Sequence, residues 1–145
     1  MQKFVADTFG RIIILELERG EKIIESVEGT LKELGVKNAY IASGIGSVQR
    51  LRYHKPTSLS AQSEDIFIDE VGAFEFGGIA GTVINGVAHF HFTIADMNGV
   101  HAGHLEYGTE VLYLAEITLV ELPGFALERK VTDENVKKLF EMTES

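Results

Sequence analysis

Four of the five histidines in the 145-residue chain lie between His89 and Gly108. His89 and His91 stand two residues apart in a segment that alternates as a β-strand does, so both imidazoles leave the same face of the strand. Two imidazoles placed in this way can bind one cation, and His104 is the expected third ligand, with His101 a less regular candidate. Three neutral histidines with an open coordination position are typical of Zn²⁺, and Fe²⁺, Mn²⁺ or Ni²⁺ would accept the same ligands.

Two other interpretations fit the same residues. The strand histidines could be exposed polar side chains, with His104 hydrogen-bonded in a turn. The segment from His89 to Gly103 also resembles the first cupin motif, with Asp96 where glutamate is usual. The cupin interpretation is weaker because Val83 replaces an early glycine of that motif and no histidine follows His104 to supply a ligand from a second motif.

The histidine pair belongs to a predicted β-hairpin. Asn85-Gly86 separates two apolar segments, and this dipeptide favours the positive dihedral angles of a two-residue hairpin turn. The turn sets two small side chains, Thr82 and Ala80, opposite the two histidines, which leaves volume for an ion. The other face of the hairpin is the predicted core face: Ile79, Gly81, Val83, Phe90, Phe92 and Ile94.

The remaining elements predict an α+β domain with a large, mainly antiparallel sheet. In chain order they are a strand at 11–17, a helix at 21–34 capped by Gly35, strands at 38–42 and 48–53, a loop at 56–64, extended segments at 65–76, the hairpin, and a long strand at 110–122. Gly44 and Gly46 lack the third glycine of a dinucleotide-binding loop, so they indicate a tight turn or bulge. A short C-terminal helix should begin after Thr132 and bury Val136, Leu139 and Phe140.

Composition restricts the classes of function. The length suits a single domain spanning residues 1–145, and the net charge of −9 opposes binding to a phosphate backbone. The absence of cysteine means that any metal must be bound through nitrogen and oxygen. No apolar segment is long enough to span a bilayer and no signal peptide precedes the first strand, so we expect a cytoplasmic protein.

The motif around the histidines resembles the plants and prokaryotes conserved (PPC) domain, in its single-domain prokaryotic form. The matching residues are HFH at 89–91, Asp96, Gly99 and AGHL at 102–105, with further agreement in ERGEKI at 18–23, SGIGSV at 43–48 and GAFEF at 72–76. Ala102 departs from the glycine of the family pattern. The resemblance implies a mixed sheet with few helices, a homotrimer, and a fold related to acetolactate decarboxylase, whose zinc is bound by a similar three-histidine arrangement. Carried over by position, the ligands are His89, His91 and His104.

Three functions follow as hypotheses. The first is a metal-binding protein of unassigned chemistry with a small-molecule ligand at the metal; Arg52, Glu75 and Glu106 are the charged candidates beside it, each expected to be solvent-exposed. The second is DNA binding, a function attached to the family through plant members with AT-hook segments, whose Arg-Gly-Arg-Pro core is absent here. The third is an assembly or regulatory module that joins subunits through GAFEF and the strand edges.

Overall fold

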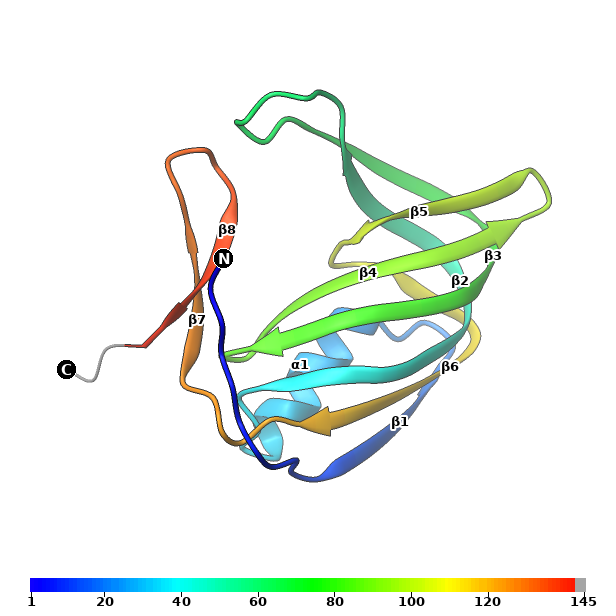
Figure 1. Cartoon of the computed structure of the whole chain (residues 1–145). Helices are drawn as coiled ribbons and strands as arrows, with labels where there is room; N and C mark the ends of the chain where they lie inside the picture. The colour runs from blue at the N-terminus through cyan, green and yellow to red at the C-terminus, as the bar shows by residue number, and fades with distance from the viewer. Residues whose placement is uncertain (143–145) are drawn as a thin grey trace.

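The computed structural model describes residues 1–142 and contains one α-helix and eight β-strands in that range (Figure 1). The elements are β1 (Ile12–Glu18), α1 (Ile23–Glu33), β2 (Ala39–Pro56), β3 (Asp65–Ile84), β4 (Val87–Asp96), β5 (Gly99–Leu105), β6 (Glu110–Glu121), β7 (Leu127–Val131) and β8 (Lys137–Glu141).

Six strands form one sheet in the order β1-β6-β2-β3-β4-β5, and β7 and β8 form a separate hairpin. Strand β5 also pairs with β2, so the far end of the sheet closes on itself. Every strand pairing among residues 1–142 is antiparallel, which confirms the mainly antiparallel sheet; the parallel pairs that a mixed sheet requires are not among them. No helix in this range is long and apolar enough to cross a membrane.

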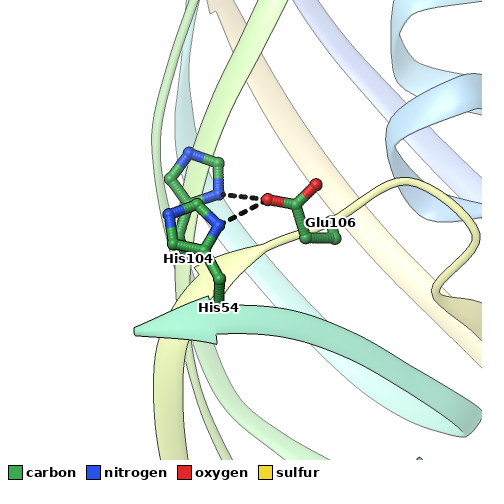
Figure 2. A group of neighbouring side chains, drawn as sticks. All are labelled: His54, His104 and Glu106. Atoms are coloured by element: carbon green, nitrogen blue, oxygen red, sulfur yellow. Dashed lines mark hydrogen bonds and ion pairs between the residues drawn. The ribbon is translucent and has the colours of Figure 1, made fainter. Parts of the chain in front are cut away.

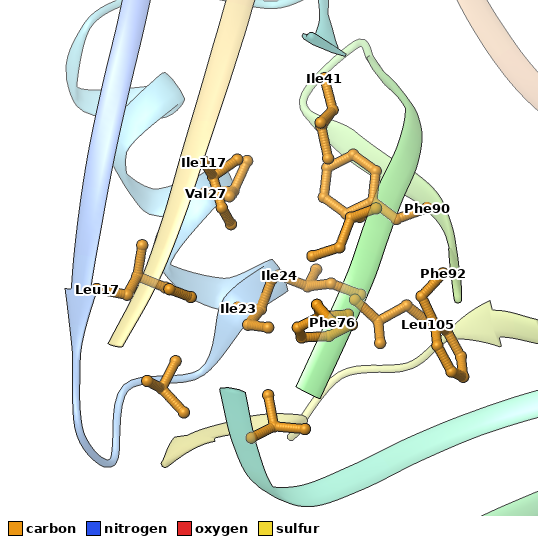
Figure 3. Close-up of a cluster of buried hydrophobic side chains, with 14 of the residues drawn as sticks. Leu17, Ile23, Ile24, Val27, Ile41, Phe76, Phe90, Phe92, Leu105 and Ile117 are labelled. Carbon is orange, nitrogen blue, oxygen red and sulfur yellow. The ribbon is translucent and has the colours of Figure 1, made fainter. Parts of the chain in front are cut away.

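The core lies between α1 and the inner face of the curved sheet (Figure 3). Helix residues Ile23, Val27 and Leu31 are fully buried, and so is Phe90 of β4. The helix runs where the periodicity predicts it and ends at Glu33; Gly35, just beyond the end, has a φ of 70°, which glycine favours at this capping position. An isolated helix of this length is only marginally stable in water, so its stability here depends on burial of this apolar face.

The structure confirms the β3–β4 hairpin, both in its strand register and in which face points to the core. Asn85 and Gly86 both have positive φ, 49° and 77°, and the strands pair Thr82 with His89. The predicted core side is inside, with Phe90 and Ile94 almost without exposed surface. The two-residue turn therefore fixes which face carries the histidines.

Strand β2 is one continuous strand, and the prediction of two separate strands was wrong. The segment at 43–47 does not reverse the chain; register shifts against β6 fall between Ile41 and Ser43 and between Gly46 and Val48. Gly46 has a φ of 135°, and an added Cβ would lie 2.3 Å from the Leu114 carbonyl oxygen. The glycines thus bend a long strand so that its second half can reach β5.

The predicted C-terminal helix was also wrong. Residues 137–141 form β8, which pairs with β7 after a turn in which Asn135 has a φ of 57°. The spacing of Val136, Leu139 and Phe140 fits one face of a helix, but an isolated helix this short is unstable in water. Pairing with β7 gives the backbone its hydrogen bonds and lets Leu127 be buried.

Candidate metal centre

Four histidines from three strands share one face of the sheet. His89 and His91 lie on β4, His104 on β5 is paired with His91, and His54 on β2 is paired with His104. Directly paired residues of an antiparallel sheet point to the same side, so the four rings form a row on the side away from the core. His104 therefore lies on a strand and not in a turn.

The three predicted ligands lie in contact with one another. The ring centroids of His89 and His104 are 4.7 Å apart, those of His89 and His91 5.2 Å, and those of His91 and His104 5.3 Å. The Nε2 atoms of His89 and His91 are 3.2 Å apart. The structure therefore places the three rings side by side on one face of the sheet.

A second group shares His104 with this set (Figure 2). The ligand atoms of His54, His104 and Glu106 all lie within 4.8 Å of one another, and this group includes neither His89 nor His91. His54 Nδ1 lies 2.6 Å from Glu106 Oε1, and His104 Nδ1 lies 3.4 Å from the same oxygen. The rings of His54 and His104 stack with centroids 4.2 Å apart. His54 and Glu106 thus belong to the site.

The electrostatic environment favours neutral imidazoles. Burial, followed by the charges of His104 and Arg129, lowers the pKa of His89 to about 4. Burial also lowers the pKa of His91 and of His104, with the His54 charge as the next cause for both. Since only an unprotonated ring nitrogen binds a metal, the three rings are in the ligand form at neutral pH. In addition, His104 Nδ1 is buried without a hydrogen-bond partner. These features fit a cation.

The histidine face opens into a cavity of about 1020 Å³. The cavity is lined by residues of β2, β4 and β5 on one side and by residues of the β7–β8 hairpin on the other. A site that combines an open space of this size with convergent polar groups is the usual setting for a small-molecule ligand.

The other predicted residues lie elsewhere. His101 is paired with Ile94 and lies near Asp96, so it does not join the histidine row. Arg52 pairs with Asp69, and Glu75, on β3 opposite Ala95, is exposed. Among the three charged candidates, only Glu106 lies at the site, where it is partly buried.

Two residues of the site were not identified from the sequence. His54 is distant in sequence from the other histidines and reaches His104 only because β2 pairs with β5. Arg129 lies on β7, a strand that was not predicted, and it donates to Thr82 and to Val87, which lines the cavity. Both placements depend on long-range pairing; the isolated fifth histidine was the one available signal.

The departure at Ala102 is structurally harmless. Ala102 is exposed, whereas an added Cβ at Gly103 would lie 2.8 Å from the His54 carbonyl oxygen. Glycine is therefore required next to His104, where β5 approaches β2, and not one residue earlier.

Similarity to known proteins is consistent across most of the chain. A family model described as the Plants and Prokaryotes Conserved (PCC) domain matches residues 5–123. No curated protein sequence matches the chain significantly.

Solved structures share the fold. A plant- and prokaryote-conserved (PPC) protein from Pyrococcus horikoshii is 26% identical, with a TM-score of 0.80 over 97% of this chain and 100% of its own. A metal-containing protein from Archaeoglobus fulgidus is 23% identical, with a TM-score of 0.80 over 92% of this chain and 95% of its own. A protein from Bacteroides thetaiotaomicron, described as a candidate DNA-binding protein, is 17% identical, with a TM-score of 0.75 over 92% of this chain and 96% of its own.

Proposed function

The chain belongs to the Plants and Prokaryotes Conserved domain family, and we propose that it is a metal-binding protein that holds one Zn²⁺ ion through His89, His91 and His104. The observation that carries the proposal is the contact among these three imidazoles at the wall of a large cavity. The metal-containing relative from Archaeoglobus fulgidus supports it.

The chemistry of the donor set favours zinc. Three neutral nitrogen ligands leave a fourth position open, and an ion bound in this way acts as a Lewis acid or lowers the pKa of a bound water. Glu106 accepts from His54 and lies 3.4 Å from His104 Nδ1, where it would orient the His104 ring on metal binding as carboxylates commonly orient metal-binding histidines. His54 holds that carboxylate in place.

The competing donor set is His54, His104 and Glu106, and among residues 1–142 it is the set whose ligand atoms all lie within 4.8 Å of one another. We favour the three-histidine set because His54 and Glu106 already bond each other at 2.6 Å, and an ion held by both would break that bond. Among residues 1–142, His89 and His91 pair with no carboxylate; their Nε2 atoms lie 3.2 Å from each other, and burial disfavours the protonated form of both rings.

The test is elemental analysis of protein purified without added metal. Wild type should contain about one zinc per chain, and the His89→Ala/His91→Ala double variant should contain almost none. His101→Ala is the matched control, since His101 lies outside the row and should leave the metal content unchanged. A His54→Ala/Glu106→Gln variant should keep the metal with about 10–100-fold lower affinity. Metal-free wild type, or metal loss confined to the last variant, contradicts the proposal.

We also propose that the chain assembles as a homotrimer. Large apolar side chains lie exposed on the outer surface of β1 and β6, including Ile12 at 71%, Ile14 at 70% and Leu114 at 43% exposure. Exposed apolar residues grouped on one sheet are typical of an interface between subunits. Light scattering should give about three times the chain mass of 16.0 kDa, and an Ile12→Glu/Ile14→Glu variant should dissociate. A monomeric wild type contradicts this proposal.

DNA binding is the second candidate, since a structural relative carries that description. The net charge of −9 opposes it, because affinity for duplex DNA rests largely on Lys and Arg releasing condensed counterions. A salt-sensitive mobility shift of duplex DNA at physiological ionic strength would favour it over a role confined to metal and small molecules.

A further inference from the structure

We infer that the cavity beside the histidines binds small organic molecules through a carboxylate group, which the guanidinium of Arg129 receives. This inference names the ligand class of the proposed metal site and rests on that proposal for its placement. Arg129 lies beyond residues 5–123, the part of the chain that matches the family model.

Arg129 is held in a fixed position at the cavity wall. Its Nη1 donates to the Val87 carbonyl oxygen at 3.0 Å, and its Nη2 donates to Thr82 Oγ1 at 2.7 Å. Thr82 is paired directly with His89, so the guanidinium lies beside the histidine row. In Figure 1 the β7–β8 hairpin stands next to the end of β3 and β4 from which these acceptors come.

The guanidinium has no anionic partner among residues 1–142. None of the ion pairs in this range includes Arg129, and the neighbouring Glu128 pairs with Lys130 at 2.8 Å. Arg129 is partly buried, and burial alone lowers its pKa, with no nearby carboxylate to raise it. A partly desolvated arginine with free N–H groups is an unusual arrangement unless an anion completes it.

The surroundings select the kind of anion. The planar fork of one guanidinium matches the two oxygens of one carboxylate. Lys55 and Lys137 also line the cavity, and so do the carboxylates of Asp65, Glu106 and Glu128, so Arg129 is the cation there that offers such a fork. Phe67, Val87 and Val136 supply apolar wall for the rest of a ligand. Because the whole chain carries a charge of −9, attraction over long distance is weak and affinity depends on these direct contacts.

The position of Arg129 relative to the histidines suggests how such a ligand would lie. Arg129 and Lys137 line the same cavity as His89 and His91, and Arg129 donates to Thr82, the residue paired with His89. A carboxylate held at Arg129 would therefore direct the other end of a short molecule toward the open side of His89, His91 and His104. This arrangement fixes both ends of one ligand.

The test uses a simple probe, hexanoate, titrated into metal-free protein and followed by ¹H–¹⁵N chemical shifts. Hexanoate should shift the Arg129 Nε signal and the amides of Thr82 and Val87, whereas hexanamide, which lacks the charge, should not. Arg129→Gln should weaken hexanoate binding about ten- to a hundred-fold, as expected for loss of a charge-assisted hydrogen bond.

Lys138→Gln is the matched control. It removes one positive charge from the same hairpin at a residue that does not line the cavity, and it should bind hexanoate like wild type. Arg129→Lys keeps the charge without the fork and should bind with intermediate affinity. If Arg129→Gln does not fold, the comparison of hexanoate with hexanamide on the wild-type protein still tests the inference.

Equal shifts from hexanoate and hexanamide, or equal binding by Arg129→Gln and Lys138→Gln, overturn the inference. Hexyl phosphate that binds more tightly than hexanoate also overturns it, since the site would then be built for a phosphate group. Because the titration uses metal-free protein, its outcome is separate from the metal analysis of the proposed function.

Discussion

Replacing Gly81 by alanine should lower both the stability and the metal content of the protein, because this glycine of β3 is paired with Phe90, between His89 and His91 on β4. Gly81 has a φ of 137°, and an added Cβ would lie 2.1 Å from the His89 carbonyl oxygen. The backbone conformation alone costs a residue other than glycine about 1–3 kcal/mol, and overpacking adds about 1–3 kcal/mol. The sum is about 2–6 kcal/mol. The strain is relieved only if β4 moves away at His89.

Thermal unfolding followed by circular dichroism measures the first effect. A loss of this size should lower the melting temperature by roughly 5–20 °C for a chain of this length. Gly78→Ala is the matched control on the same strand, since its added Cβ would have no atom within 4 Å. Elemental analysis of the two variants measures the second effect, and Gly81→Ala should bind less zinc. Equal melting temperatures and equal metal content for the two variants would refute the reasoning.

Three further predictions follow from particular residues. The metal-free protein should lose about 1–2 kcal/mol of stability in urea titrations as the pH falls from about 6.5 to 4, because His89 is protonated in that range only in the unfolded chain. Partial solvent exposure of the ring keeps the loss this small, and His89→Gln should reduce it. Phe90→Ala should lower the free energy of unfolding by about 3–5 kcal/mol in the same titrations, since Phe90 is fully buried. A loss below about 1 kcal/mol would contradict the burial of Phe90. Gly86→Ala should cost only about 1 kcal/mol and leave the metal content unchanged, because its φ of 77° is unfavourable but no atom lies within 4 Å; loss of metal would contradict this.

Features fixed by local sequence were predictable. The Asn85-Gly86 turn determines the register of β3 and β4, and that register decides that His89 and His91 share a face outside the core. The helix was predictable for the same reason, since its apolar periodicity and Gly35 lie within one segment. His104 could be proposed because few residues separate it from the strand pair.

Features fixed by long-range pairing were not predictable. His54 joins the site through the pairing of β2 with β5, and nothing within either strand encodes that contact. The glycines at 43–47 gave a correct signal of irregular backbone, but only the pairing of β2 with β6 shows that they bend one strand. Arg129 was missed because the C-terminal apolar residues fit helical spacing while the protein uses them in a hairpin.

The most direct test of the three-histidine site is a crystal structure of the zinc-loaded protein with data collected at the zinc absorption edge. The proposal predicts a single anomalous peak bounded by ring nitrogens of His89, His91 and His104, with its open side toward the cavity that Arg129 lines. A peak held by His54, His104 and Glu106, or no peak on this face of the sheet, would contradict it.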